Sequence, residues 1–145
     1  MSLPQQKFRE IVFQILYASD FGCEEKDEVV SFLMPVLKAT KKAIKLASDR
    51  AAAISEHTPT MDELIAKKSM AYDFNRISRV ERNVLRLGLF ELIHDPGIPP
   101  KVAIHEAVRL CRKFGTRESA HFINAILDGI YKEKYLQSAE VQASV

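Results

Sequence analysis

Apolar residues recur at helical spacing along most of the chain. Over Gln5–Phe21 they are three or four positions apart, which predicts a helix with one buried face that stops at Gly22. Residues 29–37 repeat this pattern and predict a second helix. Pro35 should end or kink that helix near Met34, because proline lacks the amide hydrogen that a helix interior uses.

The middle of the chain predicts two helices separated by a proline. The first should run from about Ala39 to Glu56, and the sequence His57-Thr58-Pro59 should end it. Thr60 and Glu63 have the spacing of a capping box, in which each side chain bonds the other residue's backbone amide. A short fourth helix is therefore predicted to begin at Thr60.

A strongly apolar helix is predicted after Ser78, which forms a second capping box with Glu81. Gly88 lies in the middle of this helix, where glycine costs about 1 kcal/mol relative to alanine. Such a glycine indicates that another backbone approaches closely, so this helix should be central. The sequence Asp95-Pro96-Gly97 should end it.

Two further helices are predicted in the last third of the chain. Pro99-Pro100 should begin the first and Gly115 should end it, with Thr116 as the N-cap of the second. The first should bury Val102, Ala103, Ala107, Val108, Leu110 and Cys111. The second should bury Ile123, Ile126, Leu127 and Ile130. The tail, residues 138–145, is polar, and we expect it to fray.

These elements predict an all-α fold, a single compact domain over residues 1–145 with about seven helices. No segment shows the alternation of a β-strand. Glycine and proline number 5 and 6, below the roughly 17 that average usage of about 12% would give. Few turns are therefore expected, and the glycine-rich loops that bind phosphates, GxGxxG and GxxxxGK[ST], are absent from the sequence.

The sequence contains no recognisable catalytic or metal-binding motif. The two cysteines, Cys23 and Cys111, are far apart without a CxxC partner, so we expect reduced thiols. None of the four histidines forms HExxH, and His105 is interpreted as a surface or capping residue. No apolar run of 18 residues and no signal peptide is present. We therefore expect a soluble, cytoplasmic protein without catalytic residues, cofactor or metal.

Positive charge is concentrated in two segments although the net charge is only +2. Residues 76–86 carry four arginines against Glu81, and residues 101–117 carry five basic residues against Glu106. Phe114 and Phe122 accompany the second cluster. Cations hold phosphates and exposed rings stack bases, so this combination suits single-stranded nucleic acid. Two alternatives remain open at this point: the rings belong to the core, and the charges form an ordinary solvated face.

Several segments in order resemble the signature of the NusB family. The longest is Arg76–Leu92, RISRVERNVLRLGLFEL. It is followed at matching spacing by Ile98-Pro99, Val102–Val108, Lys113–Gly115, Glu118-Ser119 and Phe122–Asp128. Arg9 and Leu16-Tyr17 also match, so the resemblance covers Lys7 to about Tyr131.

This resemblance implies an all-helical fold with two helical subdomains. It also implies a transcription antitermination factor without catalytic activity. Such factors bind single-stranded boxA-type RNA together with NusE, a small-subunit ribosomal protein. They join the RNA polymerase antitermination complex with other Nus factors, notably at ribosomal RNA operons.

The resemblance also assigns residues to the two interfaces. The RNA side corresponds to Lys7, Arg9, Phe114, Glu118 and Phe122. The NusE side corresponds to Tyr17, Arg76 and Glu81.

The chain departs from the family pattern in ways that affect these assignments. Many members begin with an arginine-rich run, which is absent from residues 2–6. The RNA contact is therefore expected to be weaker or to shift to Lys113 and Arg117. Glu118 places a negative charge beside the predicted RNA path, where it repels phosphate unless it accepts a hydrogen bond from a base.

Other classes of protein remain open on the sequence alone. A protein-binding helical scaffold would show the same helices without RNA affinity. A NusB-like domain of an RNA cytosine methyltransferase would require a cofactor-binding glycine loop, which this sequence lacks. An enzyme without a recognisable motif is a further alternative. The sequence leaves two oligomeric states open, a monomer and a dimer that hides the RNA face.

Overall fold

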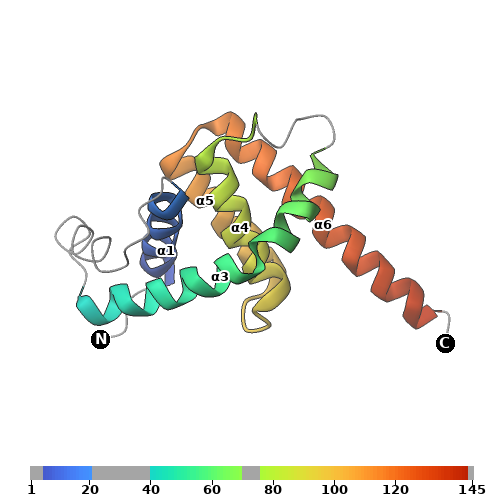
Figure 1. Cartoon of the computed structure of the whole chain (residues 1–145). Helices are drawn as coiled ribbons and strands as arrows, with labels where there is room; N and C mark the ends of the chain where they lie inside the picture. Colours follow the sequence, from blue (N-terminus) through green and yellow to red (C-terminus); the bar gives the residue numbers. More distant parts are fainter. Residues whose placement is uncertain (1–4, 21–39, 70–75, 144–145) are drawn as a thin grey trace. The chain divides into compact units, whose positions relative to one another are not determined.

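The structure is a computed structural model that describes residues 5–20, 40–69 and 76–143. These residues form five helices and contain no strand (Figure 1), which confirms the all-α class. The helices are α1 (Gln5–Asp20), α3 (Lys41–Lys68), α4 (Arg79–His94), α5 (Pro100–Phe114) and α6 (Arg117–Ala143). The predicted stop at Gly22, the predicted helix over residues 29–37 and Cys23 lie outside the described residues.

The chain divides into two compact units, Met1–Thr58 and Pro59–Val145. The first unit contains α1, whose predicted apolar face is confirmed: Ile11, Val12, Ile15 and Leu16 are all buried. The boundary between the units falls inside α3. Two helical units agree with the two subdomains that the family resemblance implies.

Helix α3 corrects the prediction for the middle of the chain. The predicted end at Pro59 and the predicted new helix at Thr60 are both wrong, because α3 passes through Pro59 without interruption. Thr58 Oγ1 donates a hydrogen bond to the Ile54 carbonyl at 3.0 Å, one turn earlier. A buried stripe continues in register across the proline: Ile44, Ala47, Ala51, Ile54, Met61 and Ile65. Burial of this stripe outweighs the local cost of the proline.

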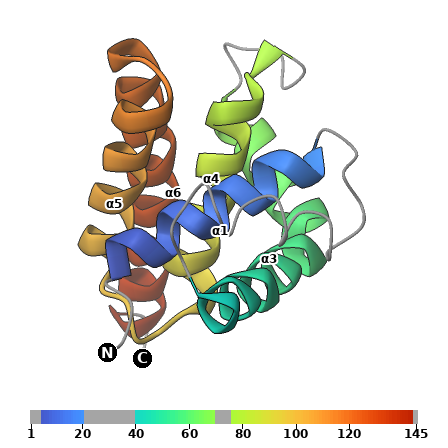
Figure 2. The same cartoon turned by 90° about the vertical axis from the view of Figure 1, so that its left-hand side faces the viewer.

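The second unit contains α4, α5 and α6, which pack against one another (Figure 2). Gly88 lies where they meet, since a Cβ built there would be 2.9 Å from Ala107 Cβ and 3.0 Å from Leu127 Cδ1. The predicted close approach at Gly88 is therefore confirmed. The predicted inward stripe of α6 is also confirmed: Ile123, Ile126, Leu127 and Ile130 are buried.

Most predicted helix boundaries in this unit are confirmed by their hydrogen bonds. The Glu81 amide donates to Ser78 Oγ at 3.1 Å, and the Ser78 amide donates to Glu81 Oε1 at 3.2 Å. Pro100 occupies the first position of α5. Thr116 Oγ1 accepts from the Ser119 amide at 3.0 Å, as expected of an N-cap.

Helix α5 differs from its predicted inward face at Val102. The side chain is 42% exposed, so its predicted burial is wrong. The buried stripe begins at Ala103, and Val102 precedes it by one position, which is about 100° around a helix. At the other end of the unit, α6 runs to Ala143, past Ser138 where we expected the polar tail to begin.

Candidate nucleic-acid interface

The junction between α5 and α6 brings together five of the predicted RNA-binding residues. Lys113 and Phe114 end α5, and Arg117, Glu118 and Phe122 occupy the first turns of α6. The three charged side chains of this set are exposed, and the two rings are half-buried. The other two predicted RNA residues, Lys7 and Arg9, lie on α1 in the first unit.

The turn that makes this junction is tight. The Gly115 amide donates to the Cys111 carbonyl at 2.7 Å, which closes the last turn of α5. A Cβ at Gly115 would lie 3.0 Å from that carbonyl oxygen and 3.3 Å from Val80 Cγ1. Glycine therefore allows a short connection between α5 and α6. As a result, the exposed residues Lys113 and Arg117 lie on either side of the same turn.

The two phenylalanines are neither fully buried nor fully exposed. Lys113 Nζ lies 5.8 Å from the centroid of the Phe114 ring, within the range of a cation–π contact. A half-buried ring keeps one part available to a base while the rest packs against the protein. The stacking role of Phe114 and Phe122 stays a prediction.

Arg9 differs from the other predicted RNA residues because it is only 6% exposed. A phosphate contact needs an accessible guanidinium, so this structure favours the half-buried Lys7 over Arg9. Among the predicted NusE residues, Arg76 is exposed, and Tyr17 is half-buried with its ring 5.9 Å from that of Phe13. Glu81 is half-buried and is engaged in the capping box of α4.

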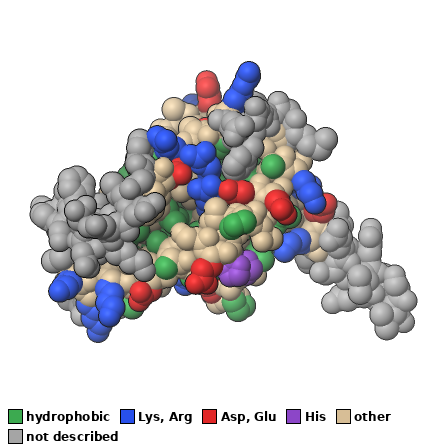
Figure 3. Space-filling model, in the orientation of Figure 1, with side chains coloured by type: hydrophobic (Ala, Val, Ile, Leu, Met, Phe, Trp, Pro, Cys, Tyr) green, Lys and Arg blue, Asp and Glu red, His purple; other side chains and the backbone are tan. Residues whose placement is uncertain are grey.

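Two arginines of the predicted basic clusters are held by acids. Arg86 Nε and Nη2 donate to Asp62 Oδ1 and Oδ2 at 2.9 and 2.7 Å, a bidentate pair between α4 and α3. Arg109 Nε donates to Glu106 Oε2 at 2.7 Å, one turn away on α5. On the face seen in Figure 3, lysine and arginine side chains form several separate groups with acidic side chains near them, and no single continuous basic patch is seen.

A groove between α5 and α6, which we call the α5/α6 groove, was missed by sequence reasoning. It encloses about 540 Å³ and is lined by Lys101, Ile104, His105, Val108, Arg112, Ala120, His121, Asn124 and Asp128. The sequence contains only part of the signal, namely the polar residues of each wall. Lys101, His105 and Arg112 on α5, and His121, Asn124 and Asp128 on α6, are spaced by whole helical turns.

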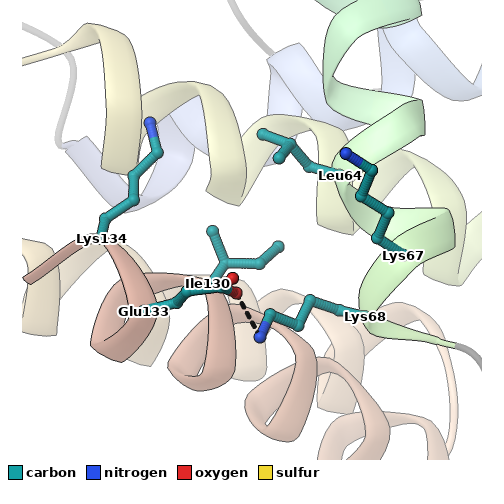
Figure 4. A pocket seen from close by; sticks show the side chains of 6 residues that line it. All are labelled: Leu64, Lys67, Lys68, Ile130, Glu133 and Lys134. Carbon is teal, nitrogen blue, oxygen red and sulfur yellow. Dashed lines mark ion pairs between the residues drawn. The ribbon is translucent and has the colours of Figure 1, made fainter. Parts of the chain in front are cut away.

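A second cavity of about 230 Å³ lies between α3 and α6, within the second unit (Figure 4). Lys68 forms an ion pair with Glu133 at its edge, and this contact lowers the pKa of Glu133. Lys67 and Lys134 project from its two sides without an ion pair to any residue that the structure describes. Both lysines are exposed.

Within the described residues, no three His, Cys, Asp or Glu side chains are grouped to hold a metal ion. Nor does any described helix have the length and apolar character needed to cross a membrane. Cys111 is fully buried, and burial raises the pKa of its thiol from 9.0 to about 11. The charge of Glu81 adds to this shift.

The described helices and the exposed cations at the α5–α6 junction define a helical protein with a charged surface beside half-buried aromatic rings. The model of the NusB family matches residues 6–132, and the chain belongs to the NusB family. This result confirms the resemblance on which the interface assignments rest.

Relatives and solved structures support the same family over nearly the whole chain. A transcription antitermination protein NusB of Dehalococcoides mccartyi (strain CBDB1) is 36% identical over 132 residues, 91% of this chain and 92% of the relative. The solved NusB of T. maritima superposes with a TM-score of 0.77 at 36% identity and covers 92% of this chain and 94% of its own. A solved complex of antitermination factors NusB and NusE with dsRNA gives a TM-score of 0.75 at 28% identity, covering 89% and 96%.

Proposed function

We propose that this protein is a transcription antitermination factor of the bacterial cytoplasm. It binds single-stranded boxA-type RNA together with NusE and joins the RNA polymerase antitermination complex with other Nus factors. It works by assembly and not by catalysis. The observation that carries the proposal is the α5–α6 junction, where exposed cations stand beside half-buried rings in a chain of the NusB family.

The chemistry of the junction suits a single strand. Lys113 and Arg117 supply ammonium and guanidinium donors for phosphates, and both side chains are exposed. Base stacking on an aromatic ring contributes about 1–3 kcal/mol per base. Phe114 and Phe122 each offer part of a ring for this purpose. Glu118 is the one acid among these residues, and a base edge would satisfy it better than a phosphate.

Thermodynamic linkage joins the two partners. If NusE supplies part of the RNA-binding surface, NusE and RNA each raise the affinity of this protein for the other by the same factor. We therefore expect NusE to be captured more strongly when boxA-type RNA is present. Titration of the protein with RNA at several salt concentrations tests directly whether the protein contacts phosphates. The logarithm of the affinity falls with log salt at a slope near −0.7 for each phosphate contacted.

A flat salt response, or no RNA binding even with NusE present, would leave the protein-binding scaffold as the better account. Retention of NusE without any RNA effect would point in the same direction.

Sedimentation or light scattering of the free protein would show whether it is a monomer or a dimer.

Substitution of Phe122 tests the aromatic part of the interface. We expect Phe122→Ala to weaken RNA binding about 5- to 150-fold, the range for one stacked base, without a large change in melting temperature. Leu46→Ala is the matched control, because it truncates a large side chain that is 54% exposed and lies on α3. A large loss of stability in Phe122→Ala would instead make Phe122 a packing residue.

Glu118→Asn tests the one acid of the junction. Removing its charge is expected to tighten RNA binding, because it ends the repulsion with phosphate. Weaker binding in a titration would identify Glu118 as an acceptor for a base.

Glu81→Lys tests the NusE side. We expect weaker NusE association, but Glu81 also caps α4, so the variant loses helix stability as well. Ser78→Ala separates the two effects, because it breaks the same capping box and leaves the Glu81 carboxylate in place. If Ser78→Ala weakens NusE association as much as Glu81→Lys, the assignment of Glu81 to this interface is wrong.

A further inference from the structure

We propose that the α5/α6 groove is a second RNA-binding surface, which receives the nucleotides that leave the α5–α6 junction. This inference rests on the proposed function. The groove runs between the two helices that meet at the junction, and its lining does not include Phe114, Glu118 or Phe122. It therefore adds a site to those that the family resemblance assigned.

One end of the groove lies near the junction along both helices, and three basic side chains mark the path between them. Arg112 and His121 line its nearer end, and Arg117 lies one turn before His121 on the same face of α6. An RNA strand that contacts Arg117 at the junction would thus meet Arg112 next.

The far end of the groove lies at Lys101 on α5 and Asp128 on α6. Asp128 is ion-paired with Lys132 at 3.0 Å, so its charge is offset there. A strand can therefore follow the groove to its end without meeting an unpaired acid among the lining residues.

Apart from Asp128, the polar side chains that line the groove make no side-chain hydrogen bond or ion pair within the part of the chain that the structure describes. Arg86 and Arg109, by contrast, donate hydrogen bonds to Asp62 and Glu106. No described hydrogen bond or ion pair engages the following exposed groove residues: Lys101, His105, Arg112, His121 and Asn124. These side chains are available to an incoming ligand.

The chemistry of the lining favours RNA over an acidic protein segment. Lysine and arginine hold phosphates, while asparagine and histidine carry donors and acceptors for base edges and ribose hydroxyls. A protein segment would need a pocket for an apolar anchor. The apolar floor offers little room for one, since Ile104 is 9% and Ala120 is 2% exposed, and only Val108 is half-buried.

The length of the groove sets how many nucleotides it can hold. Lys101 and Arg112 are eleven positions apart on α5, a span of about 16 Å at about 1.5 Å per residue. A stacked strand carries one phosphate per about 3.4 Å, so at most about five nucleotides fit. RNA that only covers the junction would leave the groove empty.

The test compares RNAs of two lengths on the full chain with NusE present. One RNA carries the boxA-type element alone, and two others extend it by about five nucleotides at either the 5′ or the 3′ end. Affinity is measured by fluorescence anisotropy over a range of salt concentrations. We expect extension at one end to tighten binding about tenfold and to steepen the salt slope by about 0.7 for each added phosphate contact.

The groove variant is Lys101→Gln combined with Arg112→Gln. It should abolish the gain from the extension, make the salt slope for the longer RNA shallower by about 1.4, and leave the shorter RNA unaffected. The matched control is Lys67→Gln combined with Lys134→Gln in the other cavity (Figure 4). It removes the same charge from exposed side chains of the same unit, and it should keep the full gain.

Three results would overturn the inference. The first is an extension that adds no affinity at either end. The second is a control variant that loses as much affinity as the groove variant. The third is that a hexaglutamate peptide binds the wild type but not the groove variant, while the extended RNA binds no more tightly than the shorter one. That result would assign the groove to an acidic protein segment. If even the shorter RNA fails to bind, the proposed function itself falls; if only the extension has no effect, the proposed function stands.

Discussion

Gly88→Ala is expected to destabilise the protein, although alanine is the better helix former. The substitution places a Cβ 2.9 Å from Ala107 Cβ and 3.0 Å from Leu127 Cδ1. Carbon atoms in contact prefer about 3.5–4.0 Å, so α5 would have to move away from α4 by about 0.6 Å or more. Ala107 Cβ is fixed to the backbone and cannot turn aside.

The magnitude follows from two opposing terms. Overpacking of a core costs about 1–3 kcal/mol, while replacing an interior helical glycine by alanine stabilises by about 1 kcal/mol. We expect a net loss of up to about 2 kcal/mol in the free energy of unfolding. The melting temperature should fall by up to roughly 8 °C, since 1 kcal/mol corresponds to about 2–4 °C for a chain of similar size.

Urea unfolding followed by circular dichroism measures this loss, and Gly129→Ala is the matched control. A Cβ at Gly129 would meet only Lys68 Cδ, at an ordinary 3.7 Å, so Gly129→Ala should gain up to about 1 kcal/mol. Combining Gly88→Ala with Ala107→Gly should cost less than the sum of the two single changes, because the closest contact is removed. If Gly88→Ala is as stable as Gly129→Ala, the close packing of α4 on α5 is not what requires glycine.

Three further outcomes follow from the structure. Burial raises the pKa of the Cys111 thiol from 9.0 to about 11, so the native state keeps this thiol protonated at pH values where the unfolded chain loses the proton. The free energy of unfolding therefore contains the full contribution of this thiol below about pH 9. It should decline by about 2–3 kcal/mol as the pH rises toward 11. Urea unfolding at several pH values should show this decline in the wild type and a smaller one in Cys111→Ala. Pro59→Ala should raise stability by about 1–3 kcal/mol, because it restores an amide donor to the Ser55 carbonyl inside α3; equal or lower stability would mean that the helix has adapted fully to the proline. Asp62→Asn should cost about 1–2 kcal/mol by weakening the bidentate bond to Arg86, whose partly exposed position moderates the loss; a thermal shift below about 1 °C would make that pair dispensable.

Sequence reasoning succeeded where the determining contacts are local. The capping box of Ser78 and Glu81 and the cap at Thr116 involve residues three apart, and Pro100 requires only its own fixed φ to begin α5. Gly88 was also interpreted correctly, because glycine inside an apolar helix is costly unless close packing requires it. Its contacts with Ala107 and Leu127 became known only from the packed helices.

Sequence reasoning failed where distant residues decide. Arg86 was counted in the local positive charge of residues 76–86, but Asp62, twenty-four positions earlier, forms an ion pair with it. The burial of Arg9 likewise depends on tertiary packing. For the same reason the α5/α6 groove was missed, because its two walls come together only when the helices pack.

The proline inside α3 has an unexpected use in dividing the molecule. A polypeptide that began at Thr58 would place Pro59 at the first helical position, where its missing amide hydrogen has no intrahelical partner to lose. Thr58 would then serve as the N-cap of a shortened helix. The Pro59 ring thus destabilises α3 in the whole chain but favours the start of the shortened helix in the fragment. Pro59 therefore marks a natural starting point for expressing the C-terminal unit, residues 59–145, on its own.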